Sequence, residues 1–172
     1  ESGSGKSITA LSALGLLDKT VFKSTGGEIK YGNKSISSMS DGDLNRIRGD
    51  EMTMIFQEPM SSLNPVQTIE TQINESAKLS IHDINADHIK QAFENVGLTN
   101  AEKILKSYPH MLSGGQRQRA MIAMSIIRKP KLLIADEPTT ALDVTLQKQI
   151  LDTLNRLKNQ LDMSMILISH NI

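Results

Sequence analysis

The feature that most constrains the fold is an apolar run at positions 132–135, followed at once by the acidic residues Asp136 and Glu137. A short, nearly continuous apolar run is typical of a strand buried within a parallel sheet. Further apolar runs at 52–56 and 163–168 indicate two more strands, and helical patterns separate the three. Ligands of open α/β sheets bind at the carboxyl ends of the strands. We therefore expect the two acids to lie at a ligand-binding edge, with different roles because side chains alternate along a strand.

A glycine-rich segment opens the chain and leads into an apolar helical pattern at 8–17. Its sequence is Glu1-Ser2-Gly3-Ser4-Gly5-Lys6-Ser7. The segment resembles the phosphate-loop pattern GxxxxGK[ST], although the first glycine of that pattern would fall just before the first residue. Gly3 and Gly5 allow the backbone N–H groups to face phosphates. In such loops the lysine, here Lys6, reaches the β- and γ-phosphates of a nucleotide, and the hydroxyl of Ser7 ligates Mg²⁺.

A second glycine-rich segment, Ser113-Gly114-Gly115-Gln116, precedes a long helical pattern. Ser113 is predicted to be the N-cap, and Gln116 three residues later completes a capping box. Two glycines leave the first backbone N–H groups of the helix uncovered, and such a helix start attracts anions. Taken alone, the segment favours a capped structural helix. Together with the phosphate loop and the acidic strand end, it favours an anion site.

The composition excludes several classes of site. The 172 residues suffice for one domain with a sizeable core. The chain has 19 basic and 19 acidic residues, which makes general nucleic-acid binding less expected than for a basic chain. It has no cysteine, which excludes disulfides, thiolate metal sites and cysteine nucleophiles. No apolar run approaches the roughly 20 residues of a membrane-spanning helix. The chain starts with Glu inside a motif, so we interpret it as a fragment from which targeting segments could be missing.

The other expected elements carry no evident chemistry. They are an antiparallel flap at 26–37, helices at 43–48, 69–79, 87–96, 101–106 and 144–161, and the end of the 113–129 helix at Pro130. Gly97 is expected to stop the helix before it. The polar helical stretch 68–108 separates the two halves of the nucleotide core, so we interpret it as part of an inserted subdomain.

The order of the motifs resembles that of ATP-binding cassette (ABC) ATPases. The phosphate loop is followed by Gln57 at a strand end, the Ser-Gly-Gly signature, the acidic pair, the loop 138–143 and His170. The resemblance implies an α/β P-loop NTPase (RecA-like) core with a mostly parallel sheet, a small antiparallel β flap and an inserted helical subdomain. It implies a single ABC ATPase domain over 1–172, truncated at both ends, with a core of 1–57 and 130–172 and a helical subdomain at about 58–129.

The same resemblance implies a role for each motif residue. Asp136 corresponds to the acid that acts on Mg²⁺, Glu137 to the general base, Gln57 to a residue that reaches Mg²⁺ or the attacking water, and His170 to a γ-phosphate contact. The residues expected to bind ATP are Ser2, Gly3, Ser4, Gly5, Lys6, Ser7, Ser113, Gly114, Gly115, Gln116 and Asp143.

Four segments, 57–65, 108–111, 117–124 and 136–144, are similar to the ATPase subunits of bacterial oligopeptide, dipeptide and nickel importers. This similarity implies a peripheral protein on the cytoplasmic face of the membrane that hydrolyses ATP to power import. Its implied partners are a second ABC ATPase subunit (identical or different), two transmembrane permease subunits and an extracytoplasmic substrate-binding protein, with no nucleic acid. In such dimers, Ser113 of one subunit faces the γ-phosphate held by Lys6 of the other.

Two alternatives stay open at this point. ABC ATPases of DNA repair or chromosome maintenance share the motifs, but a long coiled coil or zinc modules normally separate their halves, whereas here the interval is short and free of cysteine. A nucleotide-binding module without hydrolysis is disfavoured by the presence of Glu137, Gln57 and His170. The sequence does not name the transported cargo, because cargo contacts lie in partner chains.

Overall fold

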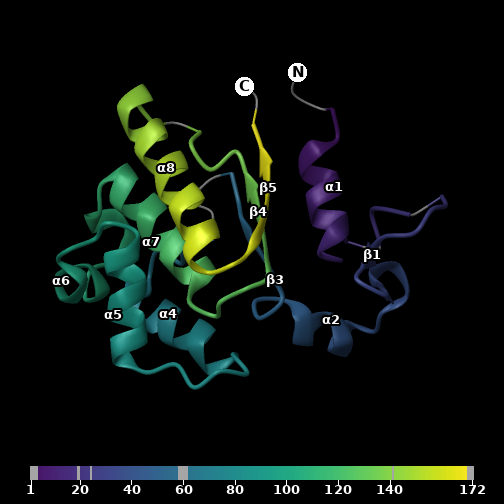
Figure 1. The fold of residues 1–172 in the computed structure, drawn as a ribbon, viewed down its shortest axis with the longest axis horizontal. Coiled ribbons are helices and arrows are strands. Elements are labelled where there is room, and N and C mark those ends of the chain that lie inside the picture. The colour runs from purple at the N-terminus through teal and green to yellow at the C-terminus, as the bar shows by residue number, and fades with distance from the viewer. Residues whose placement is uncertain (1–3, 19, 24, 58–61, 141, 170–172) are drawn as a thin grey trace.

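The computed structural model describes residues 4–18, 20–23, 25–57, 62–140 and 142–169. Figure 1 shows how the helices and strands of these residues are arranged. Their bounds are α1 Lys6–Ala13, β1 Lys30–Tyr31, β2 Lys34–Ser35, η1 Ile36–Ser38, α2 Asp41–Ile47, β3 Met52–Ile55, α4 Ile69–Lys78, α5 Ala86–Asn95, α6 Ala101–Leu105, η2 Pro109–Met111, α7 Gly114–Ile126, β4 Leu132–Asp136, α8 Val144–Gln160 and β5 Ser164–Ile168.

The central sheet has the strand order β3-β4-β5, and both pairs are parallel. Met52 pairs with Leu132, and Leu132 pairs with Ser164, so the three strands begin and end at matching levels. Parallel neighbours need crossover connections. The segment with α4–α7 connects β3 to β4, and α8 connects β4 to β5. The apolar runs therefore form the parallel α/β sheet that the sequence predicts.

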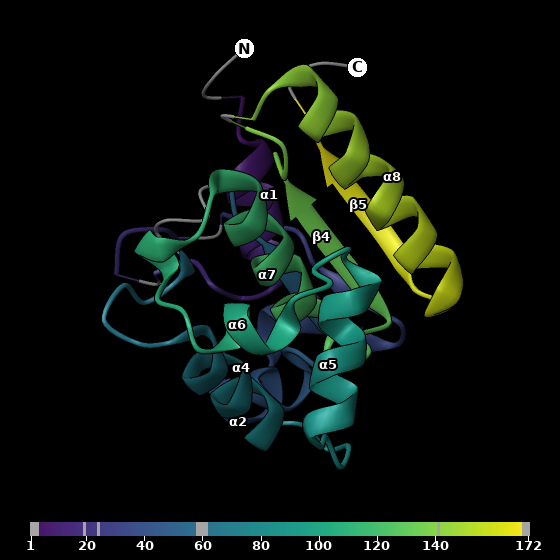
Figure 2. The ribbon, with the colours of Figure 1, turned by 90° about the vertical axis from the view of Figure 1, so that its left-hand side faces the viewer.

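Alternation along the strands gives the sheet two apolar faces. Met54 and Ile134 belong to the cluster that contains Ala10 of α1 and residues of α2. Ile55 and Leu133 belong to the larger cluster formed with α4–α8. Figures 1 and 2 show α1 on one side of the sheet and α7 and α8 on the other. The result is a three-layer arrangement with helices on both faces.

The predicted division into a core and a helical subdomain at about 58–129 stays a prediction. Phe93 of α5, Ile73 of α4 and Ile122 of α7 are fully buried. They lie in the same apolar cluster as Leu133 of the sheet. The helical segment therefore packs directly on one sheet face.

Most predicted elements are confirmed with bounds shifted by a few residues. The antiparallel flap is confirmed as the β1–β2 hairpin, turned by Gly32 at φ 56°. Gly97 has φ 80° and follows α5, as expected of a helix stop.

Three expectations were wrong in detail. The first helix ends at Ala13 rather than near residue 17, because Gly15 turns the chain at φ 63°. The signature helix ends at Ile126, before Pro130, because Lys129 at φ 52° redirects the chain toward β4. The strand β5 is not buried, since Ile166 is 49% exposed and Leu167 is 42% exposed. In the described part of the chain β5 is an edge strand, and this explains the exposure.

Candidate nucleotide-binding site

The described part of the phosphate loop runs from Ser4 into α1. Gly5 is the N-cap and has φ 84°, a left-handed conformation that glycine adopts without steric cost. Its carbonyl accepts a hydrogen bond from the Thr9 N–H at 2.9 Å. The Lys6 ammonium donates to the Ser4 hydroxyl at 2.8 Å. The helix start therefore has the backbone form of an anion site, with Ser7 in its first turn. Ser2 and Gly3 lie outside the described residues.

Asp136 is the last residue of β4, the central strand, and is only 3% exposed. Its Oδ1 atom has no hydrogen-bond partner among the described residues. A buried carboxylate oxygen without a donor is costly, and a bound cation, ligand or water molecule would satisfy it. The start of α1 and the carboxyl ends of β4 and β5 lie at the same edge of the sheet (Figure 1). The unpartnered oxygen thus lies at the edge where the sequence predicts the nucleotide.

Glu137 follows Asp136 and has φ 48°, a conformation that non-glycine residues rarely adopt. Its N–H donates to the Ile168 carbonyl at 2.9 Å, which ties the turn to the end of β5. Its Oε2 atom accepts hydrogen bonds from the Gln57 amide at 2.9 Å and from the Thr140 hydroxyl at 3.0 Å. The fold thus joins two predicted catalytic residues that are 80 positions apart. Strained backbone at a strand end is a feature of functional sites.

The signature segment has the predicted capping box. The Gln116 N–H donates to the Ser113 hydroxyl at 3.3 Å, and the Ser113 N–H donates to the Gln116 side chain at 2.9 Å. Gly115 is buried, and a Cβ there would lie 2.7 Å from a methyl group of Leu146 in α8. This glycine therefore has a packing role beyond the bare amides that the sequence suggested. Gly114 is half-buried beside Leu142.

Two further predicted site residues stay predictions. Asp143 is the N-cap of α8 and accepts a hydrogen bond from the Leu146 N–H at 2.9 Å. Its carboxylate therefore has a structural role in this chain. His170 lies outside the described residues.

Sequence reasoning missed two glutamines that hold the loop after Glu137. The Gln118 amide donates to the Pro138 carbonyl. The Gln147 amide donates to the carbonyls of Thr139 at 3.3 Å and Leu142 at 3.1 Å. No clear sequence signal existed for Gln118, because it lies between two arginines in the polar first half of α7 and its burial depends on tertiary packing.

Comparison with known proteins identifies the family. The sequence profile of the family described as ABC transporter matches residues 1–140. The chain belongs to the ABC transporter family. ATP binding is general in this family, and the parallel sheet with helices on both faces is its P-loop NTPase fold.

The chain is similar over its whole length to curated ABC proteins. It is 51% identical to the peptidoglycan transport ATP-binding protein YejF of Agrobacterium fabrum and 49% identical to the oligopeptide transport ATP-binding protein AppD of Bacillus subtilis. All of this chain is aligned in both cases, with 32% of the first relative and 53% of the second. The chain therefore spans about a third to a half of the length of these relatives.

Solved structures agree with the fold. The dimeric post-hydrolysis structure of the ATP-binding cassette MJ0796 bound to ADP and Pi superposes with a TM-score of 0.80 at 25% identity. The aligned region covers 99% of this chain and 72% of that one. The cbiO1 structure from Clostridium perfringens, part of the cbiONQ transporter complex, gives a TM-score of 0.79 at 26% identity, with coverage of 99% and 64%.

Proposed function

We propose that this chain is the ATP-hydrolysing part of a bacterial importer of peptides. The observation that carries the proposal is the junction of Glu137 with Gln57 beside the unpartnered oxygen of Asp136, at the edge where α1 begins. The names of the relatives, which include oligopeptide transport and peptide import, support peptides as the cargo. Nickel complexes are the second cargo that the sequence resemblance implies.

Mg²⁺ together with ATP fits the residues of this edge. Magnesium bound with a nucleotide takes one or two carboxylates or hydroxyls from the protein and its other ligands from phosphate and water. Asp136 supplies an oxygen that lacks a donor among the described residues, and Ser7 supplies a hydroxyl in the first turn of α1. We assign these two residues to the magnesium ion, with Gln57 as a third candidate. The ion would neutralise charge on the phosphates.

Each residue of the site then has its own role in ATP hydrolysis. Lys6 and the amides at the start of α1 hold the phosphates. Glu137 accepts a proton from the attacking water, and the hydrogen bonds from Gln57 and Thr140 fix the orientation of its carboxylate before nucleotide binds.

The partners follow from the same proposal. The signature segment Ser113–Gln116 would face the nucleotide of a second ABC subunit, as the sequence resemblance implies, and dimeric cassettes are among the similar solved structures. Two permease subunits would carry the cargo across the membrane, and an extracytoplasmic binding protein would deliver it. In the part of the chain that the structure describes, every helix is too short or too polar to cross a bilayer. We place the chain at the cytoplasmic face, bound to the permease.

The deciding experiment is the Glu137→Gln substitution in the intact protein. Loss of the general base should lower ATP turnover about 10²–10⁴-fold while equilibrium binding of Mg-ATP is retained. Turnover is measured by phosphate release, and binding by calorimetry. Near-normal hydrolysis by this variant would overturn the assignment. Stimulation of turnover by membranes containing the permease, and not by DNA, would support transport over DNA repair.

A second variant tests the dimer. Ser113→Arg should leave ATP binding by the mutant subunit intact but block hydrolysis, because the new cation would occupy the anion site used by the partner. Lys6→Ala is the matched control and should weaken binding within the subunit itself. Equal losses of ATP affinity in the two variants would contradict an intersubunit role for Ser113.

A further inference from the structure

The turn after Glu137 is held by main-chain and side-chain contacts at nearly every position. The Thr140 N–H donates to the Glu137 carbonyl at 3.1 Å, which closes a four-residue turn with Pro138 and Thr139 at its centre. The carbonyls of both central residues accept side-chain amides. Gln118 binds the Pro138 carbonyl and Gln147 binds the Thr139 carbonyl. The orientation of these two peptide planes, and with them the position of Glu137, is therefore set from outside the turn.

The two glutamines come from different helices. Gln147 is in the first turn of α8, which directly continues the loop. Gln118 is in α7, the helix whose start carries Ser113, and it is only 2% exposed. Of these two contacts, the Gln118 hydrogen bond is the one that connects the signature helix to the turn of the predicted general base.

Packing between the two helix starts supports the same connection. Gly115 lies so close to Leu146 of α8 that a Cβ would meet its methyl group at 2.7 Å. Close-packed contacts of this kind transmit displacement rather than absorb it. A movement of the first turns of α7 therefore reaches the loop along two routes, through the Leu146 contact and through the Gln118 amide.

We propose that Gln118 is a positioning residue that makes the turn carrying Glu137 follow the movements of the signature helix. This inference rests on the proposed ATPase function. In a dimer with shared sites, Ser113 of one chain contacts the nucleotide of the partner, whereas Glu137 of the same chain acts on its own nucleotide. Gln118 thus links the two ATP sites through each chain, and the state of one site changes the geometry of the general base in the other.

The test compares Gln118→Leu with Gln147→Leu in the intact protein. Leucine has a volume similar to that of glutamine but no donor, so each variant leaves one carbonyl of the turn without its amide. For Gln118→Leu we expect kcat to fall about tenfold, ATP affinity to stay within about twofold, and the Hill coefficient for ATP to fall but to stay above 1, because the contact between Gly115 and Leu146 remains. For Gln147→Leu we expect a lower kcat with the Hill coefficient retained, because this variant keeps the link to the signature helix.

The pH dependence of the activity of a further variant distinguishes a positioning role of Gln118 from a role in packing alone. In Gln118→Glu the burial of position 118 should raise the pKa of the new carboxyl, whose neutral form can donate to the Pro138 carbonyl whereas its ionised form cannot. Both kcat and the Hill coefficient of Gln118→Glu, each relative to the unmodified protein, should therefore be higher near about pH 6 than near about pH 8. The corresponding ratios for Gln118→Leu should not change. If Gln118→Leu fails to fold, the profile of Gln118→Glu decides the question alone.

The inference is overturned if Gln118→Leu keeps a normal kcat and Hill coefficient, or if Gln147→Leu loses cooperativity to the same extent. A flat profile for Gln118→Glu also overturns it. These outcomes are distinct from a failure of the proposed function, which is judged by Glu137→Gln. If Glu137→Gln abolishes turnover and Gln118→Leu does not alter it, only the coupling role is lost.

Discussion

Two buried aspartates at opposite ends of the sheet have contrasting surroundings. Asp50 precedes β3 and is 5% exposed, whereas Asp136 ends β4. Both oxygens of Asp50 are bound. Its Oδ1 atom accepts from the Ser80 hydroxyl at 2.8 Å and from Arg128 Nε at 3.1 Å, and its Oδ2 atom accepts from the Arg128 guanidinium. The Oδ1 atom of Asp136 has no partner among the described residues. The first carboxylate is thus fully used within the fold, whereas the second has an oxygen available for the magnesium ion that we propose.

The Asp50 site joins three parts of the chain. Arg128, just after α7, also donates to the Leu79 carbonyl at the end of α4, at 2.9 Å. The Ile81 N–H donates to Asp50 at 3.4 Å. Gly49 has φ 90°, and a Cβ there would clash with the guanidinium of Arg128. The helical segment is thereby fixed to the amino end of the sheet.

The largest expected effect concerns Asp136. Asp136→Asn should lower Mg-ATP turnover on the order of 10²-fold or more, because a neutral amide is a poor magnesium ligand. The free energy of unfolding without nucleotide should not fall, since the Oδ1 atom has no hydrogen bond among the described residues to lose. Denaturant titrations and phosphate release measure the two quantities. A variant that is destabilised yet fully active would show that Asp136 is structural, like Asp50.

The next effect concerns the ion pair. Either Asp50→Asn or Arg128→Met should cost about 3–5 kcal/mol of unfolding free energy, because each leaves an uncompensated buried group. ATP turnover per folded molecule should change little. The double variant Asp50→Asn/Arg128→Met should be more stable than the sum of the single losses predicts. Additive losses would show that the two side chains do not act as a pair.

Acid should weaken the same site. Burial raises the pKa of Asp50, but the hydrogen bonds from Arg128 and Ser80 and the charge of Arg128 outweigh it, so the pKa lies below 3.8. A lowered pKa means that its stabilisation is complete above about pH 3.8 and is lost as the pH falls through the folded value. Urea titrations across this range should show a smaller acid loss for Asp50→Asn. If the free energy of unfolding of the two proteins falls by the same amount in acid, Asp50 is not the cause of the acid destabilisation.

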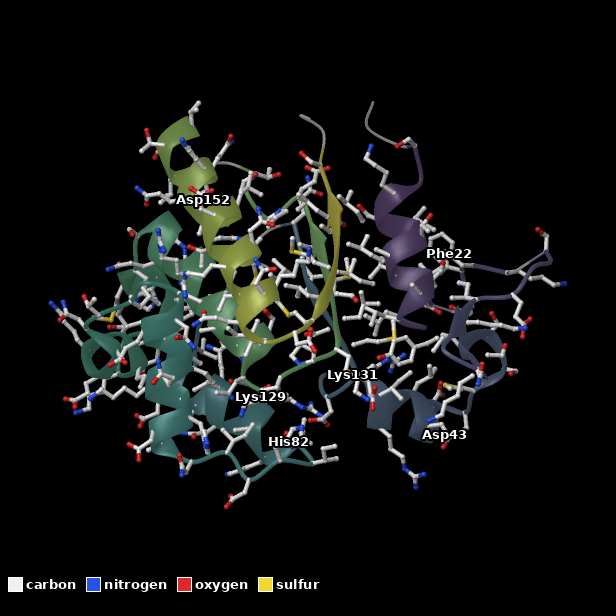
Figure 3. All side chains as sticks on the ribbon, in the orientation of Figure 1. Phe22, Asp43, His82, Lys129, Lys131 and Asp152 are labelled. Atoms are coloured by element: carbon white, nitrogen blue, oxygen red, sulfur yellow. The ribbon has the colours of Figure 1, made fainter. Side chains whose placement is uncertain are left out.

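The smallest effect is expected at a neighbouring pair on the surface. Lys131 lies 3.0 Å from Glu51 near the same end of the sheet as Asp50, and Figure 3 labels this lysine. The hydrogen bond from Lys131 lowers the pKa of Glu51, yet the Lys131 side chain is 70% exposed. Lys131→Ala should therefore cost no more than about 1 kcal/mol. A loss as large as that of Arg128→Met would mean that burial is not what distinguishes the two pairs.

The sequence by itself determined the class of fold and the local structure of its motifs. The apolar runs predicted the parallel strands, because strands buried between helices need no polar face. Ser113 and Gln116 predicted a capping box, because that interaction is local and spans three residues. The glycine pattern before Lys6 predicted the helix start, which the structure confirms at Gly5.

Only the tertiary structure decided which distant side chains meet. Gln57 and Glu137 are 80 positions apart, Asp50 and Arg128 are 78 apart, and Gln118 reaches a carbonyl 20 positions away. Such pairs form only when strands and helices pack together, so the sequence around one residue does not show which distant residue it will contact. The exposure of β5 also depends on the tertiary structure. The same apolar sequence can form a strand that other elements cover or a strand that they leave exposed. Periodicity reports the conformation of a segment, whereas burial and hydrogen bonding depend on what the rest of the chain places beside it.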